Sequence, residues 1–151
     1  MNFDFNRLYL TTDGRIGRQD FWIGVVGLLV VSIVVAFIIG SLFFVLGRAS
    51  MILMFIVQIA LAYPAYCLMA KRFQDRDKPG KFAAILIGLG LLIALFGILG
   101  LTGNPMTGGN ALGWFLNLVQ FVVAIWFLVE LGFLRGTDGD NQFGADPVGN
   151  G

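Results

Sequence analysis

The fold is decided by residues 21–46, which read FWIGVVGLLVVSIVVAFIIGSLFFVL and contain no charged side chain. A helix needs roughly 20 apolar residues to cross the hydrocarbon layer of a bilayer, so this stretch is long enough to span one. Three further charge-free stretches follow, at residues 51–70, 82–109 and 110–129. We therefore expect an all-α membrane protein whose four transmembrane helices form a bundle.

The composition of the chain points the same way. Of its 151 residues, 58% are hydrophobic and 13% are charged, and a domain of this size leaves much of its surface exposed when it folds. Lipid is the solvent that can cover the excess apolar surface. The net charge of +1, with basic and acidic residues mixed, does not favour a nucleic-acid partner.

Turn residues divide the chain into three parts. We expect an interfacial segment at 1–19, a four-helix domain at 20–134 and a polar tail at 135–151, with helices at about 20–46, 51–70, 82–101 and 111–134. The connections at 47–50 and 102–110 are short, so each pair of consecutive helices should form an antiparallel hairpin. Pro64 in the second helix is expected to cause a kink.

The basic residues indicate the orientation. Nine of the ten Lys and Arg residues flank the helices on the side of the two termini, and only Arg48 lies on the other side. Because cytoplasmic loops of membrane proteins carry the excess of Lys and Arg, both termini and the central loop are expected in the cytoplasm.

The sequence lacks the residues of common catalytic centres. It contains no histidine and a single cysteine, Cys67, which excludes Ser-His-Asp and Cys-His pairs, imidazole metal sites and an intrachain disulfide. No phosphate-binding glycine loop of the P-loop type is present. We therefore expect no catalytic residue, no metal and no cofactor.

Three charged motifs should lie at similar depth on the cytoplasmic side: GRIGRQD at 14–20, KRFQDRD at 71–77 and DGDNQFGADP at 138–147. Mixed charges at one depth favour pairing between the segments or a rim that contacts lipid headgroups over the remaining alternative, a binding site for a ligand or protein. The candidate binding or structural residues are Gly14, Arg15, Arg18, Asp20, Trp22, Lys71, Arg72, Asp75, Asp77, Glu130, Asn141, Gly144, Asp146 and Pro147.

Glu130 is the ionisable residue inside an apolar run. An unpaired charge within the bilayer is costly. Because Glu130 lies near the expected interface, we predict pairing with Lys71, Arg72 or Arg135 in preference to a proton relay.

Two other functions remain open. A small permease or channel for an ion or small solute could use Gln58, Pro64, Asn117 and Gln120, although helix packing and interhelical hydrogen bonds also explain these residues. A lipid-acting enzyme could use Asp75, Asp77 and Asp146 with a divalent cation.

The three motifs resemble those of the bacterial inner-membrane family catalogued as domain of unknown function 805. The matching residues are Gly14, Arg15, Ile16, Arg18, Phe21 and Trp22 before the first helix, Lys71, Arg72, Phe73 and Asp75 after the second, and Gly136, Gly139, Asn141, Phe143, Gly144, Asp146 and Pro147 in the tail. Many members of the family that the chain resembles carry a histidine just before the aspartate, whereas this chain has Gln74 there. The resemblance implies an inner-membrane location and no established activity.

The leading hypothesis is a noncatalytic membrane protein whose charged motifs bind one another, lipid headgroups or a partner protein. Small residues on one face of the third helix, among them Gly90 and Gly97, would also let a second copy or another membrane protein approach closely.

Overall fold

Helices form every long element of the structure, a computed structural model that describes residues 4–104 and 108–148. The helical elements are α1 (Phe5–Tyr9), α2 (Arg18–Ser41), α3 (Phe43–Leu46), α4 (Arg48–Asp75), the 3₁₀ turn η1 (Gly80–Phe82), α5 (Ala83–Ile98), α6 (Ala111–Phe127) and the π-helix η2 (Leu128–Phe133). Strands β1 (Gly103–Asn104) and β2 (Gly108–Gly109) form a small antiparallel pair. The extreme ends of the expected terminal segments, 1–3 and 149–151, lie outside the described residues.

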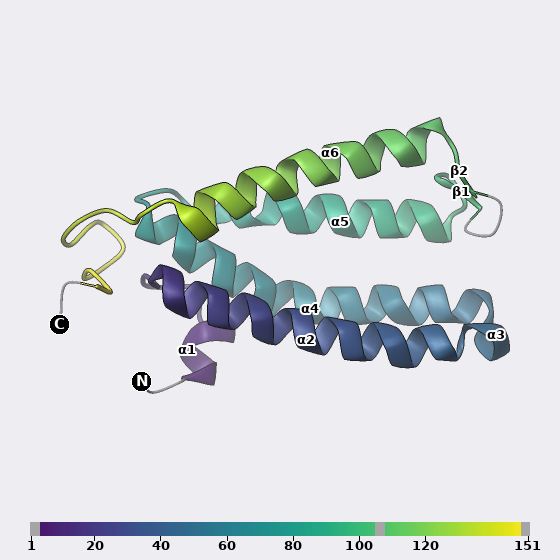
Figure 1. Cartoon of the computed structure of the whole chain (residues 1–151), viewed down its shortest axis with the longest axis horizontal. Coiled ribbons are helices and arrows are strands. Elements are labelled where there is room, and N and C mark those ends of the chain that lie inside the picture. Colours follow the sequence, from purple (N-terminus) through teal and green to yellow (C-terminus); the bar gives the residue numbers. More distant parts are fainter. Residues whose placement is uncertain (1–3, 105–107, 149–151) are drawn as a thin grey trace.

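The long helices form a bundle of two hairpins. Figure 1 shows α2 antiparallel to α4 and α5 antiparallel to α6, with α1 and the C-terminal tail at the same end of the bundle. Helix α4 packs against both α2 and α5. Four helical stretches are long and apolar enough to cross a membrane, so the all-α bundle of four candidate spans is confirmed.

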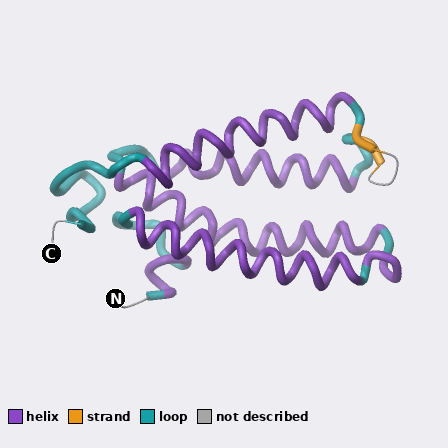
Figure 2. The backbone as a smooth tube through the Cα atoms, in the orientation of Figure 1, coloured by secondary structure: helices purple, strands orange, loops and turns teal. Residues whose placement is uncertain are grey.

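Local turns form the end of the bundle opposite the termini, where Figure 2 shows short loops and the strand pair. Gly47 has a φ of 53° between α3 and α4, a left-handed conformation that glycine adopts without strain. Asn110 caps α6, since its side-chain oxygen accepts a hydrogen bond from the amide of Gly113 at 2.9 Å. These contacts join residues that are close in sequence.

Helix α4 is longer than expected. It continues beyond the expected end at residue 70 and ends at Asp75, and Pro64 lies inside it. Lys71, Arg72 and Asp75 are therefore helical, although the sequence interpretation placed them in a loop. Arg72 and Asp75 lie one turn apart on the same face, where side chains at this spacing meet.

The buried hydrophobic core lies in the region where the charged motifs gather and in the adjoining ends of the long helices. We call the region of the motifs, formed by residues 4–20, 71–82 and 130–148, the charged end. The buried cluster contains Leu8, Tyr9, Ile16, Phe21, Leu68, Ala70, Phe73, Ala83, Phe127 and Leu131. The rings of Phe73 and Phe127 lie edge to face with centroids 5.2 Å apart, a favourable aromatic geometry.

Tyr9 connects the N-terminal segment to α2. Its hydroxyl donates a hydrogen bond to the carbonyl oxygen of Gly24 at 3.0 Å. Gly27 leaves room for this contact, because a Cβ at that position would lie 2.6 Å from the hydroxyl. Burial raises the pKa of Tyr9, so the hydroxyl keeps the proton that it donates.

Candidate functional site

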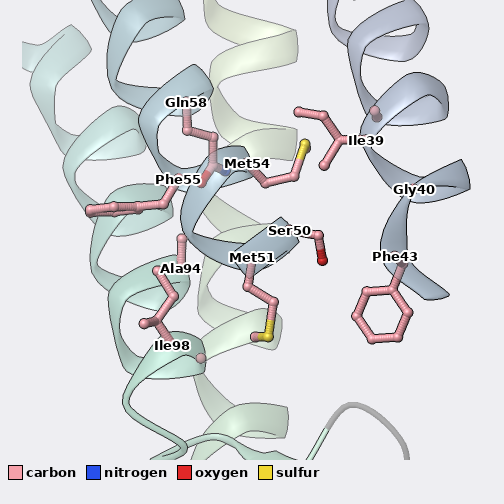
Figure 3. A pocket seen from close by; sticks show the side chains of 12 residues that line it. Ile39, Gly40, Phe43, Ser50, Met51, Met54, Phe55, Gln58, Ala94 and Ile98 are labelled. Carbon is pink, nitrogen blue, oxygen red and sulfur yellow. The ribbon is translucent and has the colours of Figure 1, made fainter. Parts of the chain in front are cut away.

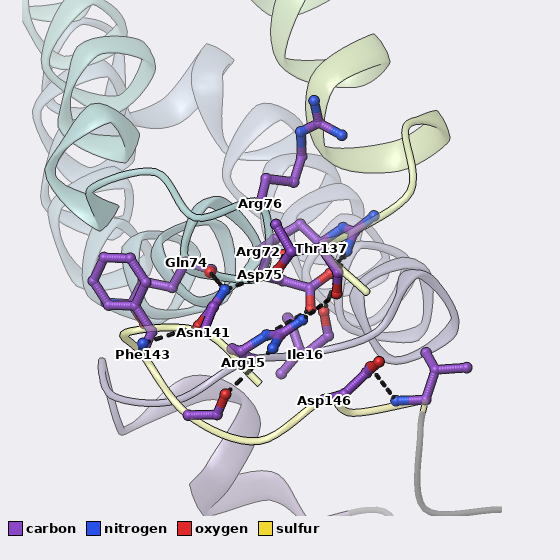
Figure 4. A network of polar contacts seen from close by, with 12 residues as sticks. Arg15, Ile16, Arg72, Gln74, Asp75, Arg76, Thr137, Asn141, Phe143 and Asp146 are labelled. Atoms are coloured by element: carbon purple, nitrogen blue, oxygen red, sulfur yellow. Dashed lines mark hydrogen bonds and ion pairs between the residues drawn. The ribbon is translucent and has the colours of Figure 1, made fainter. Parts of the chain in front are cut away.

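One carboxylate joins two distant segments of the chain. Asp75 accepts a hydrogen bond from Arg15 Nε on Oδ1 at 3.1 Å and another from Arg72 Nη1 on Oδ2. Figure 4 shows Arg15 and Arg72 converging on Asp75. Arg72 is 0% exposed, Asp75 3% and Arg15 4%. We call these three residues the arginine–aspartate cluster, and its buried charges depend on one another for compensation.

The tail, residues 135–148, supplies the other acceptors for Arg15. Nη1 donates to the carbonyl oxygens of Gly139 at 2.6 Å and Gly144 at 3.2 Å, and Nη2 donates to that of Thr137 at 2.7 Å. A planar guanidinium group with five N–H donors can bind several acceptors at once, which a lysine ammonium cannot do in the same geometry. Arg15 thereby ties the tail to the start of the chain.

Arg72 binds the end of the fourth span. Its Nε donates to the carbonyl oxygen of Leu131 at 2.7 Å, and its Nη2 donates to that of Leu134 at 2.6 Å. The last carbonyl groups of a helix lack partners within the helix and carry partial negative charge, which a buried cation can compensate. The helix ends there with a π turn, in which the amide of Leu134 donates to Val129 at 3.1 Å.

The tail is ordered by hydrogen bonds to α4. Thr137 donates to the carbonyl oxygen of Asp75 from its amide at 2.9 Å and from its hydroxyl at 3.1 Å. Asn141 Nδ2 donates to the carbonyl oxygen of Gln74 at 2.9 Å. These bonds explain how a segment with little apolar content keeps a defined conformation.

Two turns within the tail use residues that the sequence interpretation selected. The carboxylate of Asp146 accepts hydrogen bonds from the amides of Gly139 at 3.0 Å and Val148 at 2.9 Å. Gly144 has a φ of 137° and exchanges two backbone hydrogen bonds with Asn141, each 3.1 Å long. Pro147 follows Asp146 in the same loop.

Gly136 is required by the cluster itself. A Cβ at this position would overlap the Oδ2 atom of Asp75. The backbone of the tail can therefore lie against the carboxylate only because residue 136 has no side chain.

Lys71 performs a similar role for α1. This residue is 1% exposed, and its Nζ donates to the carbonyl oxygens of Arg7 and Leu8, the latter at 3.0 Å. Since these carbonyls lie near the C-terminal end of a five-residue helix, the buried ammonium group compensates their partial negative charge.

Glu130 is paired with residues other than those predicted. Its Oε1 accepts hydrogen bonds from Arg76 Nε at 2.6 Å and from Lys78 Nζ at 2.5 Å. The prediction of Lys71, Arg72 or Arg135 as partner was wrong, because the extended α4 directs the first two toward α1 and η2. Arg135 instead pairs with Asp138 at 2.9 Å.

Trp22 and Arg18 connect α2 to η2. The indole Nε1 of Trp22 donates to the carbonyl oxygen of Gly132 at 3.2 Å, and Arg18 Nη1 donates to that of Phe133 at 3.4 Å. Arg18 remains exposed. The two side chains lie one turn apart on α2, beside the charged end.

Three other sequence candidates support the local backbone. Gly14 has a φ of 93° in the turn that leads to Arg15. Asp20 lies in the first turn of α2, where negative charge is favoured. Asp77, with a φ of 56°, accepts a hydrogen bond from Gln142 Nε2 at 3.0 Å.

The candidate pathway residues do not share one site. Gln58 lines two hollows between the helices, whereas Asn117 Nδ2 donates to the carbonyl oxygen of Gly113 in its own helix at 2.8 Å. Gln120 lies beside Gly90 of α5. Its Oε1 has no hydrogen-bond partner among the described residues.

The carboxylates proposed for a metal-assisted reaction are separately engaged. Asp75 binds two arginines, Asp77 binds Gln142, and Asp146 binds amides of the tail. Within residues 4–104 and 108–148, no three His, Cys, Asp or Glu side chains come together as a set that could hold a metal ion.

Several residues of the site were not selected from the sequence. Thr137 and the carbonyl groups of Leu131 and Leu134 had no sequence signal, because any residue type supplies a backbone oxygen. Gly136 did have one: it belongs to the glycine pattern of the tail motif, and its close approach to Asp75 gives that pattern a physical reason.

Comparison with known proteins assigns the chain to a family. Residues 9–145 match the family described as "Protein of unknown function (DUF805)". The chain is 30% identical over 135 residues to "Uncharacterized protein YiiR" of Escherichia coli K12 and to the protein of the same name from Escherichia coli O157:H7, covering 88% of this chain and 83% of each relative. No solved structure matches the chain. The matched range contains the arginine–aspartate cluster and most of the tail that encloses Arg15, and the chain belongs to the DUF805 family.

Proposed function

We propose that this chain is a noncatalytic, multi-pass protein of the bacterial inner membrane, with both termini in the cytoplasm. Its three charged motifs bind one another on the cytoplasmic side and hold the four helices in one assembled bundle. The observation that carries this proposal is Asp75, which binds Arg15 from the N-terminal segment and Arg72 from α4 while the tail encloses Arg15.

The energetics of buried charge support the assembly role. Removing one partner of a buried ion pair leaves the other charge uncompensated, which costs about 3–5 kcal/mol. The partners come from the N-terminal segment and α4, and carbonyl groups of the tail complete the contacts of Arg15. If any one of these segments moved away, a buried charged group in another segment would lose its partner.

A double-mutant cycle tests the assembly role. We expect Arg72→Ala and Asp75→Ala each to lower the melting temperature of the detergent-solubilised protein strongly, and the double variant to lose much less than the sum of the two. Arg135→Ala and Asp138→Ala form the matched control, since this pair has the same i,i+3 spacing but side chains 73% and 77% exposed. Unchanged melting in both single variants of the buried pair would overturn the proposal.

The orientation has its own experiment. The concentration of basic residues at the charged end supports a cytoplasmic location for it. In a Cys67→Ala background, a membrane-impermeant maleimide should label Ala49→Cys but not Asp13→Cys in intact spheroplasts, and the reverse in inverted vesicles. Labelling of Asp13→Cys from outside intact cells would contradict this orientation.

Exposed cations at the charged end give it a second role in binding anionic lipid headgroups. Arg18, Lys81 and Arg135 are exposed, and basic side chains near a membrane surface attract anionic lipids. Membrane lipid is therefore the primary partner that we propose. A second copy of the chain or another membrane protein is the further partner that these exposed cations of the charged end could bind. Crosslinking in native membranes would detect such protein partners.

A permease or channel is the second candidate. The observations that favour it are Gln58, which is exposed between the helices, and the buried oxygen of Gln120 that lacks a partner among the described residues. Transport predicts solute flux into proteoliposomes that Gln58→Leu and Gln120→Leu abolish. Flux that survives in both variants would eliminate this pathway.

A further inference from the structure

Three hollows lie along α4 between the two hairpins. The near hollow, next to the charged end, has a volume of about 230 Å³ and is lined by residues such as Trp22 and Leu131. The middle hollow, about 200 Å³, is lined by residues including Ser32 and Ala62. The far hollow, about 330 Å³, opens where Figure 3 shows Ile39 of α2 and Met54 of α4 pointing toward each other.

The three hollows lie one after another along α4 and share lining residues, and together we call them the track. Ala65 and Leu86 line both the near and middle hollows, and Gln58 lines both the middle and far hollows. On α4 the lining extends from Ser50 to Met69. At about 1.5 Å per residue this is about 28 Å, close to the ~30 Å thickness of the hydrocarbon layer.

The chemistry of the track fits a hydrocarbon chain. Most lining side chains are apolar, and apolar cavities stay free of water but bind apolar molecules. Ser32 and Gln58 contribute polar atoms in the middle. The narrow volumes suit a single chain, whereas a helix from a second copy is about 10 Å across and would require the hairpins to separate.

A cation lies at the near end of the track. Arg18 is exposed one turn before Trp22 on α2, and the described contact of its guanidinium group is a long one, 3.4 Å to the carbonyl oxygen of Phe133. Arg18 therefore retains donors for an anionic group positioned at the membrane surface.

The geometry points to a binding site for a single-chain anionic amphiphile longer than one leaflet, such as a long polyprenyl phosphate, with its phosphate on Arg18 and its chain in the three hollows. An ordinary acyl chain that starts at the near end fills only about half of the layer, so one such chain would not reach the far hollow. The site adjoins the arginine–aspartate cluster, since Arg18 lines a small hollow with Arg72 and Asp75, but it does not depend on the role proposed for that cluster.

The experiment measures which lipid stays bound. The protein is reconstituted in phosphatidylcholine nanodiscs that contain equal small amounts of a long polyprenyl phosphate, the uncharged polyprenol and phosphatidylglycerol, and native mass spectrometry then counts what it retains. We expect the polyprenyl phosphate to be retained at least about tenfold more often than either competitor. Equal retention of phosphatidylglycerol, or no retained lipid, would overturn the inference.

Two matched pairs of variants locate the site. Ala62→Phe fills the middle hollow and should abolish retention, whereas Ala60→Phe places the same side chain on an exposed position of α4 and should leave it intact. Ala62→Leu is the smaller alternative if Ala62→Phe does not assemble. Arg18→Gln should lower retention about fivefold, and Arg7→Gln, which removes an exposed arginine of α1 that lines none of the hollows, should not. Full retention in both Ala62→Leu and Arg18→Gln would place the lipid elsewhere and contradict the proposal.

Discussion

The two ends of the bundle are held together by different kinds of contact. At the charged end, Asp75 binds residues of the N-terminal segment and of α4, and the tail closes around Arg15. At the opposite end, turns such as those at Gly47 and Asn110 connect only consecutive helices. The charged end therefore fixes which helices lie side by side, whereas the opposite end fixes where each hairpin turns.

This difference predicts that equal chemical changes have unequal effects at the two ends. A change at the charged end should loosen the whole bundle, because it removes contacts between segments that are distant in sequence. A change at the opposite end should remain local. The four substitutions below test this prediction in order of expected effect.

Asp75→Asn should have the largest effect. It leaves two buried arginines without a counter-charge, and we expect a loss of about 3 kcal/mol in the free energy of unfolding, measured as a fall in the melting temperature in mild detergent. Asp77→Asn is the control, since it removes the same charge from an exposed residue whose positive φ asparagine tolerates. Equal melting temperatures of the two variants would contradict the special importance of the buried carboxylate of Asp75.

Gly136→Ala should cost about 2 kcal/mol. The added methyl group overlaps the Asp75 carboxylate and must displace either the tail or the aspartate, and overpacking of this kind costs 1–3 kcal/mol. Limited proteolysis should then cut the tail faster than in the parent protein. Gly88→Ala is the control, because a Cβ at that position meets no atom within 4 Å; a tail equally resistant in both variants would contradict the role of Gly136.

Glu130→Gln should cost about 1.5 kcal/mol, the contribution of a hydrogen bond to a charged group. It weakens the contacts of Arg76 and Lys78 with the end of the fourth span. The same change at an exposed carboxylate, Asp138→Asn, should shift the melting temperature very little. If the two shifts were the same, Glu130 would not contribute to holding the loop after α4.

Asn110→Ala should have the smallest global effect, about 1 kcal/mol, through loss of an N-cap. Hydrogen exchange should speed up at the amides of Gly113 and its neighbours, with protection of α4 unchanged. A loss of protection throughout the bundle would mean that the opposite end also carries long-range contacts.

The apolar part of the fold was predictable from the sequence, and the charged end was predictable only in part. An apolar run such as residues 21–46 predicts a membrane-spanning helix, because hydrocarbon offers no hydrogen-bond partners and the backbone must satisfy its own donors and acceptors. The partners of Glu130 were predicted wrongly because they depend on where α4 ends, and the rotational position of each charge changes with every added helical residue. The carbonyl acceptors of Arg15 and Arg72 carry no sequence signal at all.

The π-helix η2 constrains the number of residues that the chain can have between Leu128 and Phe133. A π turn closes one residue later than an α turn, so η2 sets the rotational phase at which the chain leaves the fourth span. Deleting one residue between Leu128 and Phe133 would swing everything downstream by roughly 100° about the helix axis and carry Thr137 away from Arg15. Natural variation in length should therefore be tolerated in the loop that joins α5 to α6, and it should be eliminated by selection in these six positions.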